Sequence, residues 1–600
     1  MKNPFLYYTI GTFIFISVFG MLVPLHVLAQ DENKIPYDVT IQGLENDQLL
    51  NLIRKVSETV THQDEPPVTE GLLRRRVRND MPIINKALRS KGYYGARVET
   101  DVNTSIRPAR VVFQIETGPV YQLKDVGMEW VAPPEQKKPK IPTPKELDLE
   151  PGRPAEAGPI LEARNALLDV LRNQGFPLAE VPKPKVIVDH ADKILLVTYS
   201  INSGPFALFG LTEIEGAGSV DPSFIGEQLP WRPGEMYQIH LLEEARTNLF
   251  ETGLFNMVIF HTGNRLDAQG RIPITLQLSE REPRTLKIGL GYDTDEDVVG
   301  KIGWERRNLF HHGESLSFQG RGSGIGLTLE GNFEKPSFLQ PDQSLIFNLR
   351  LADEYPKAYE SRNINGLTQV KRKLDKGLDL ALGIGFLFSQ VEQSGEEDHY
   401  QLLSLPMAFY WDRRHDILDP MDGGGLGLRV TPYYDYMKED TYFIKSILQY
   451  QHYFRLFSEP RVVFAVRTTL GSISGTDLEA IPADLRFYAG GGDSIRGYPY
   501  QSVGAVSGAS TPIGGRSLWT LSSEFRIKIT DKIGMVPFLD GGNIFRSKYP
   551  EFDKDLFWGA GLGLRYSTPI GPLRFDVAFP LNRRETDDAF RFYISLGQAF

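Results

Sequence analysis

Residues 559–579 read GAGLGLRYSTPIGPLRFDVAF, two runs of alternating side chains joined by Pro-Ile-Gly-Pro. In the first run leucine and tyrosine alternate with glycine and arginine. In the second, large apolar residues from Leu573 to Phe579 alternate with Arg574, Asp576 and Ala578. Successive side chains of a β-strand point to opposite faces, so each run predicts a strand with one apolar face and one polar or very small face.

The same alternation recurs from Leu286 to the C-terminal residue, Phe600, with further examples at 426–436 and 590–600. These strands often reach ten residues, carry aromatic residues at their ends and are joined by Gly-, Asp- and Ser-rich stretches of unequal length. A soluble β-sandwich would also alternate, but this combination is typical of an outer-membrane β-barrel, whose apolar face meets lipid. At about 20 residues per strand and connection, residues 286–600 predict roughly 16 strands.

The composition excludes several classes of protein. The chain has 600 residues, a formal net charge of −10 and no cysteine. The acidic balance argues against nucleic acid as a partner, and the lack of cysteine excludes disulfides, thiol catalysis, thiolate metal sites and a lipoprotein anchor. Residues 1–29 combine Lys2, a long apolar run and a small residue at Ala29, which predicts a cleaved signal peptide; the alternative is an uncleaved signal anchor.

Residues 30–285 contain three similar units of about 80 residues each. Each unit has a strand-like run, then a helical part that ends at a glycine (Gly92, Gly175 or Gly253), then two alternating strands. The pattern predicts three β-α-α-β-β domains at 30–118, 119–204 and 205–285, each a small sheet covered by two helices. The proline-rich residues 131–154 predict a surface insertion in the second domain.

The most specific segment is the glycine-rich stretch from Arg486 to Gly504, which contains Gly-Gly-Gly-Asp-Ser-Ile-Arg-Gly-Tyr at 490–498. It lacks the Gly-Lys-Ser/Thr of a phosphate-binding loop. Strand parity places Glu524 and Asp540 on the lumenal face of their strands. A loop folded into the lumen could therefore pair Arg496 with both carboxylates, because a guanidinium can fork two acids. No catalytic constellation, cofactor motif or metal site is evident.

The loop also carries a family resemblance. Asp493, Arg496, Gly497 and Tyr498, together with Phe-Leu-Asp-Gly-Gly at 538–542, look like the motif of the Omp85 superfamily of outer-membrane insertases and translocators. Segments 412–423 and 569–576 are similar to other barrel segments of that superfamily, and the three N-terminal units look like its POTRA domains. Three such domains before a barrel, and the form of the loop at 489–502, are most similar to the TamA family, the outer-membrane subunits of the translocation and assembly module.

The resemblance implies an α+β plus all-β membrane fold, with three tandem POTRA domains before a 16-stranded transmembrane β-barrel at 286–600. It implies a bacterial outer-membrane protein that helps other outer-membrane proteins, such as autotransporters, to fold and insert. Its implied partners are nascent client proteins, outer-membrane lipids and an inner-membrane-anchored TamB-like protein bound by edge-strand addition to the first POTRA domain. The implied mechanism uses a weak seam between the first and last strands, marked by Leu286, Gly597 and Phe600.

Other readings stay open. A general BamA-like insertase and a two-partner secretion transporter belong to the same superfamily, and a passive outer-membrane pore is an alternative of another class. An enzyme is the remaining rival, but the ten histidines are scattered and form no recognisable Ser/His/Asp set. We therefore expect a protein that is not an enzyme and that needs no cofactor.

Overall fold

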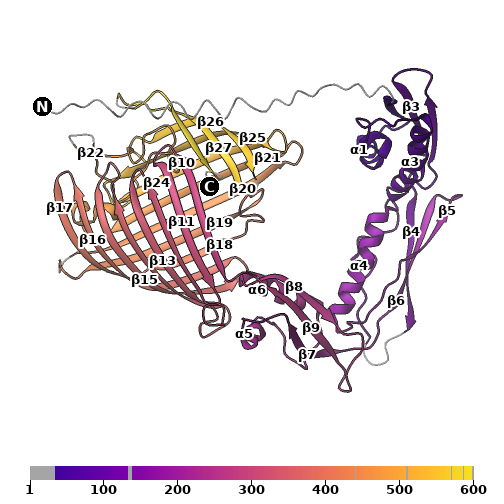
Figure 1. The fold of residues 1–600 in the computed structure, drawn as a ribbon, viewed down its shortest axis with the longest axis horizontal. Helices are drawn as coiled ribbons and strands as arrows, with labels where there is room; N and C mark the ends of the chain where they lie inside the picture. The colour runs from indigo at the N-terminus through magenta and orange to yellow at the C-terminus, as the bar shows by residue number, and fades with distance from the viewer. Residues whose placement is uncertain are drawn as a thin grey trace. The chain divides into compact units, whose positions relative to one another are not determined.

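The computed structural model describes residues 34–132, 138–438, 441–507, 511–568, 571–585 and 587–596. The chain forms two compact units. The first holds two N-terminal α/β modules, and the second holds most of a third module and a large antiparallel sheet (Figure 1). Within the described ranges, no helix has both the length and the apolar character needed to cross a membrane. The predicted signal peptide at 1–29 lies outside the described residues.

The first module has both predicted helical parts. Its elements are β1 (Tyr37–Gln42), α1 (Asp47–Val56), α2 (Glu58–Thr61), α3 (Glu70–Ser90), β2 (Arg97–Asn103) and β3 (Ala109–Glu116), and β3 lies between the edge strands β1 and β2. Alternate side chains of β3, including Val111 and Phe113, are buried in the module's core. The buried Asp80 of α3 accepts hydrogen bonds from the Ser57 hydroxyl and the Thr59 N–H, which fastens α2 to α3.

The second module departs from the predicted pattern. Its elements are β4 (Gln122–Ala132), α4 (Ala157–Asn173), β5 (Lys185–Asp189) and β6 (Ile194–Asn202), in the sheet order β4-β6-β5. The prediction of two helices is wrong here, since α4 is the one helix among the module's described residues. The prediction of a surface insertion at 131–154 is wrong for Leu147 and Leu149, which are buried in the core beside α4. Prolines in this segment disfavour a helix, and a turn at residues 144–148, closed by backbone hydrogen bonds from Leu147 and Leu149, supplies the apolar side chains instead.

The third module follows the predicted order, with β7 (Leu208–Glu215), α5 (Pro222–Glu227), α6 (Ile239–Glu251), β8 (Phe255–Thr262) and β9 (Arg271–Glu280), and β9 central in its sheet. Gly92, Gly175 and Gly253, which end the main helices of the three modules, have φ of +89°, +97° and +71°. Only glycine adopts this left-handed conformation without a steric penalty. The prediction that these glycines end helices is confirmed.

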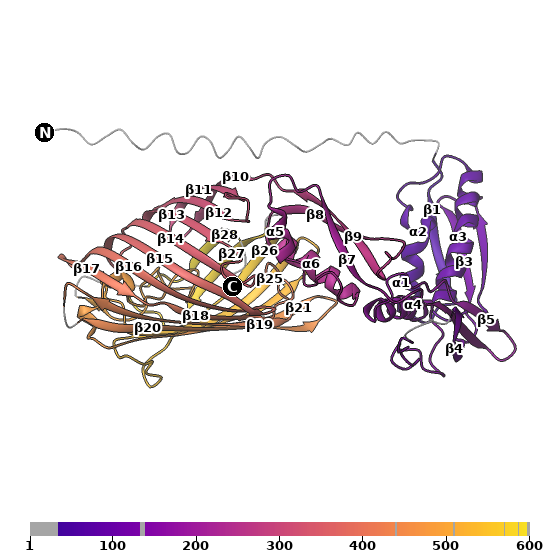
Figure 2. The same cartoon turned by 90° about the horizontal axis from the view of Figure 1, so that it is seen from below.

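The remaining strands form one antiparallel sheet (Figure 2). Their bounds are β10 (Arg284–Asp293), β11 (Asp297–Arg307), β12 (Ser315–Ser323), β13 (Gly326–Lys335), β14 (Gln343–Glu354), β15 (Glu360–Asp375), β16 (Leu378–Gln393), β17 (Glu396–Ser404), β18 (Met407–Asp412), β19 (Gly423–Asp435), β20 (Tyr442–Phe457), β21 (Val462–Ser474), β24 (Ser517–Lys528), β25 (Ile533–Phe545), β26 (Phe557–Thr568), β27 (Gly571–Pro580) and β28 (Arg591–Leu596).

The sheet has 17 described strands, but β17 and β18 share one position in the wall. Both pair with β16 on one side and β19 on the other, and Leu405-Pro406 separates them. Proline has no N–H to give to a ladder, which explains the break. With these two segments counted as one strand, the wall contains the predicted 16.

The wall closes into a barrel with an apolar outer face. Leu286, Ile288 and Leu290 of β10 are 64%, 74% and 85% exposed, as expected for side chains that face lipid. Cα atoms of β10 and β28 approach within 8 Å, which brings the first and last strands together. The fold predicted from the sequence is therefore present, with α/β modules followed by a β-barrel.

The third module is held against the barrel by contacts within the second unit. Asn308, in the β11–β12 turn, donates to the Ser219 carbonyl oxygen over 2.8 Å. Lys373, near the end of β15, forms an ion pair with Glu251 of α6. Only residues 281–283 separate β9 from β10, so the module also continues directly into the first barrel strand.

Candidate functional site

The connection between β21 and β24, residues 475–516, folds into the barrel. Its described residues, 475–507 and 511–516, contain two short 3-10 turns, Leu478–Ala480 and Ala483–Leu485, and two short strands, β22 (Val506–Ser507) and β23 (Thr511–Pro512). Its apolar side chains, such as Phe487 and Ile495, are buried in one cluster with inward-facing wall residues such as Leu402 and Phe443. Apolar burial therefore fixes this loop within the lumen rather than above it.

Arg496 is the most deeply embedded charge of the loop, with 1% of its surface exposed. Its Nε and Nη2 donate to the two carboxylate oxygens of Asp540 over 2.6 and 3.0 Å, and its Nη1 donates to Glu524 Oε1 over 3.0 Å. The guanidinium carbon also lies 3.4 Å from the centre of the Phe538 ring. The structure thus places Glu524 of β24 and Asp540 of β25 against Arg496.

A third carboxylate completes the set. Asp576 of β27 accepts from Arg496 Nη1 over 2.8 Å and also pairs with Arg565 of β26. Glu524 has a second partner, since Arg526 Nε donates to it over 3.0 Å. Reasoning from the sequence missed Asp576, although the alternation in 573–579 already placed it on the polar face. The missing information was which lumenal side chains lie at the same height in neighbouring strands.

Three glycines of β26 explain why this part of the sequence alternates with the smallest side chain. A Cβ atom on Gly559 would lie 1.8 Å from the Arg496 carbonyl oxygen, and one on Gly561 would lie 2.4 Å from the Phe538 ring. One on Gly563 would lie 2.3 Å from Asp576 Oδ1. The loop and the ion pairs around it therefore occupy the space that larger side chains on the lumenal face of β26 would need.

The neighbours of Arg496 fasten the loop backbone. The Gly497 N–H donates to the Tyr593 hydroxyl over 3.0 Å. Gly497 has φ of +101°, and a Cβ atom there would lie 3.0 Å from the Pro580 nitrogen. The buried Tyr498 donates its hydroxyl to the Trp558 carbonyl oxygen over 3.0 Å. Asp493 differs from its neighbours because its side chain is exposed, and its carbonyl oxygen accepts from Arg467 over 2.7 Å.

Comparison with known proteins identifies the family to which this barrel and its loop are similar. Residues 308–600 match the model of the Omp85 superfamily domain. The barrel is an Omp85 superfamily domain. Sheets and barrel agree with the fold of solved members: a crystal structure of BamA from Haemophilus ducreyi lacking POTRA domains 1–3 matches with a TM-score of 0.62 at 17% identity, covering 79% of this chain and 99% of that one.

Two curated relatives are outer membrane protein assembly factors named BamA. The one from Nitratidesulfovibrio vulgaris is 24% identical over 510 residues, which cover 82% of this chain and 63% of the relative. The one from Neisseria meningitidis serogroup B is 20% identical over 590 residues, which cover 87% of this chain and 72% of the relative. The chain therefore spans less than two thirds of the first relative's length. With this barrel domain the chain belongs to the bacterial outer membrane, and its POTRA-like modules lie in the periplasm.

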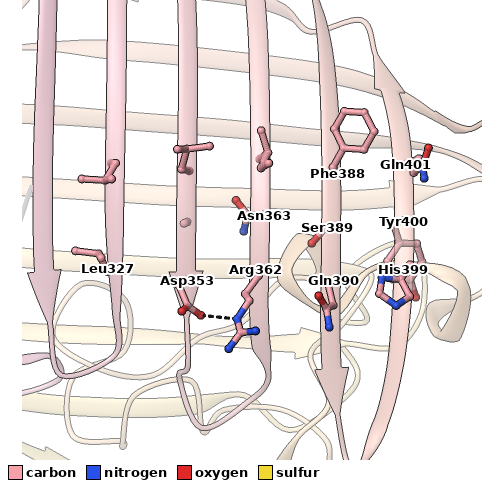
Figure 3. Close-up of a pocket in the computed structure, with 14 residues that line it drawn as sticks. Leu327, Asp353, Arg362, Asn363, Phe388, Ser389, Gln390, His399, Tyr400 and Gln401 are labelled. Atoms are coloured by element: carbon pink, nitrogen blue, oxygen red, sulfur yellow. Dashed lines mark hydrogen bonds and ion pairs between the residues drawn. The ribbon is translucent and has the colours of Figure 1, made fainter.

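The Omp85 loop has a second attachment on the opposite side of the lumen. Asp484 accepts hydrogen bonds from the hydroxyls of Ser361 on β15 and Ser389 on β16, over 2.9 and 2.7 Å. Burial raises the pKa of Asp484, and the two serine hydroxyls act against that shift. Figure 3 shows Ser389 and Asn363 side by side on these neighbouring strands. Sequence reasoning missed this attachment, because serine and aspartate in a strand and a loop carry no distinctive spacing.

The predicted seam residues are only partly described. Leu286 lies in β10 and is exposed on the outer face. Gly597 and Phe600 lie outside the described residues, so the seam can be followed from β10 to Leu596 of β28.

Proposed function

We propose that this chain is the outer-membrane component of a TamA-like translocation and assembly module, which assists the folding and insertion of outer-membrane proteins such as autotransporters. The observation that carries the proposal is an Omp85 barrel with a loop anchored in its lumen through Arg496 and preceded by three POTRA-like modules. The relatives named as outer membrane protein assembly factors support the general class of activity.

The filled lumen supports assembly over passive conduction. Residues of the 475–516 loop are buried together with wall residues of β16, β17, β20 and β25, and the loop is attached to two sides of the barrel through Arg496 and Asp484. A diffusion pore needs a water-filled lumen. The loop residues of this apolar cluster occupy lumen space that a passive pore would fill with water.

A general BamA-like insertase is the second candidate, and the names of the relatives favour it. Three modules among the described residues favour the TamA-like reading instead, because the resemblance assigns five to the general insertase and two to two-partner secretion transporters. The partner bound by the first module separates these functions. Its sheet has two edge strands, β1 and β2, where an extended partner can add a strand through backbone hydrogen bonds.

The test is photo-crosslinking in cells from single positions on β1, at Asp38 and Gln42, with partners identified by mass spectrometry. A matched control position is Arg78, which is exposed on α3 of the same module. A large inner-membrane-anchored protein captured from β1 but not from α3 is the expected result. Outer-membrane lipoproteins with many nascent barrels would favour the general insertase, one secreted exoprotein would favour two-partner secretion, and no partner at either strand position would favour a pore.

A further inference from the structure

The contact between the first and last barrel strands differs from the other contacts in the wall. Each other pair of neighbouring strands is joined by an antiparallel ladder, from β10–β11 through β27–β28. Between β10 and β28 no ladder is present within 284–293 and 591–596, although their Cα atoms approach within 8 Å. Backbone pairing in the described part of the chain therefore does not hold this seam closed.

The lumenal loop touches both sides of the seam. On the side of the first strand, Asp295 in the β10–β11 turn accepts a hydrogen bond of 2.6 Å from the Gly492 N–H. On the side of the last strand, Tyr593 of β28 accepts from the Gly497 N–H over 3.0 Å and donates to the Tyr498 carbonyl oxygen over 3.2 Å. Four residues of the loop, 493–496, therefore lie between Gly492 and Gly497, which make the two contacts.

The backbone here approaches too closely for this to be a loose surface contact. A Cβ atom on Gly491, where φ is +98°, would lie 2.5 Å from Asp295 Oδ2. Tyr593 is buried, with 3% of its surface exposed. Arg574 of β27 donates to the Gly492 carbonyl oxygen over 2.8 Å, which fixes the peptide that faces Asp295.

We infer that residues 490–498 form a clip across the seam, and that Asp295 and Tyr593 are the positioning residues that join its two ends to the first and last strands. Opening the seam then requires release of the Asp295–Gly492 hydrogen bond, the two Tyr593 hydrogen bonds, or both. The inference rests on the proposed function, because the clip matters only if the seam opens while a client protein is assembled. It assigns to the loop a role at the barrel edge, separate from the ion pairs that Arg496 makes with β24, β25 and β27.

The test measures the seam directly. The chain has no cysteine, so Leu290→Cys on β10 and Ile594→Cys on β28 provide two spin-label positions whose native side chains are exposed on the outer face. The distance distribution between the labels is measured by pulsed electron paramagnetic resonance in lipid nanodiscs. The variants are Asp295→Ala, Tyr593→Phe and the two combined. Matched controls are Asp531→Asn in the exposed β24–β25 turn and Tyr566→Phe on the outer face of β26.

We expect each single variant to raise the ratio of long to short distances by about fivefold, because a hydrogen bond contributes roughly that factor to an equilibrium. The double variant should exceed either one, and the controls should match the parent. Tyr593→Phe keeps the ring but loses the hydroxyl, whereas Asp295→Asn keeps an oxygen that can accept from the Gly492 N–H. Longer label distances in Tyr593→Phe and parental distances in Asp295→Asn would therefore attribute the effect to the hydrogen bonds. The double variant must still be folded, which is checked by the heat-modifiable migration of a barrel on gel electrophoresis. An unchanged distance distribution in that folded double variant would overturn the clip.

Client assembly in cells separates the clip from the proposed function. A longer seam distance together with altered client assembly supports both. A longer distance with unaltered assembly supports the clip and contradicts the proposed function. Unchanged distances contradict the clip whatever the assembly assay shows.

Discussion

Replacing Arg496 with alanine should destabilise the barrel through one orphaned carboxylate. The substitution removes four side-chain hydrogen bonds to three acids. Charge-assisted hydrogen bonds contribute about 1.5–3 kcal/mol each, and a simple sum would give an unrealistic total. Glu524 and Asp576 keep Arg526 and Arg565 as partners. Asp540 loses both of its guanidinium contacts and retains the backbone N–H of residue 496 at 3.2 Å.

The expected cost is therefore that of one broken buried ion pair, about 3–5 kcal/mol. The measurement is guanidinium unfolding of the barrel in detergent micelles, followed by tryptophan fluorescence. Combining Arg496→Ala with Asp540→Ala should recover part of the loss, because the uncompensated charge is then gone. Arg455→Ala is a matched control, since its pair with Asp422 is largely exposed and should contribute about 0–1 kcal/mol. A loss below 1 kcal/mol for Arg496→Ala, or no recovery in the double variant, would refute the reasoning.

Three further predictions concern the loop. Burial raises the pKa of Asp295 to about 6. The closed seam should therefore be most stable at a pH below about 4, the ordinary pKa of an aspartate, and should lose stability as the pH rises through 6, so that the spin-label distances lengthen. Asp295→Asn should abolish this pH dependence, while the charged and titratable groups around Asp295 stay in place: Asp293, Glu296, Asp493, Arg574, Arg591 and Tyr593. Asp484→Ala should cost about 1–3 kcal/mol and expose the loop to trypsin, whereas Asp484→Asn, which keeps one acceptor, should cost less; equal protection in both would contradict the second attachment. Gly559→Ala should cost about 3 kcal/mol by displacing the Arg496 carbonyl, and a stability equal to that of the Gly291→Ala control, whose Cβ would meet nothing within 4 Å, would contradict it.

The barrel and the polarity of its wall follow from local sequence because a strand has a period of two. Parity alone was enough to put Glu524, Asp540 and Asp576 on one face, since burial of one face fixes which side chains alternate inward. Parity does not say which strands are neighbours across the lumen or how far one strand is displaced along another. For this reason Asp576 and the Asp484–Ser389 contact were not found, while the pairing of Arg496 with two acids could be suggested.

The modules show the opposite limit. Their helices end at glycines that the sequence marks clearly, and Gly92, Gly175 and Gly253 adopt the expected left-handed conformation. The second module nevertheless has a hydrogen-bonded turn where a helix was expected, and Leu147 and Leu149 fill its core. A repeat in sequence predicts an equivalent core, but several chain paths can bring a leucine to the same place. For this reason the proline-rich composition of residues 131–154 predicted a surface segment, although part of it is buried.

The attachment of the third module to the barrel has a mechanical consequence. Ser219 and Glu251 of the module hold the β11–β12 turn and the end of β15, and β9 runs almost directly into β10. A tilt of this module would therefore act as a lever on one flank of the wall, the flank that begins with the first strand. The torque would reach the seam through covalent chain and two anchored turns. A load on the periplasmic side could thus be converted into strain at the barrel edge without any nucleotide.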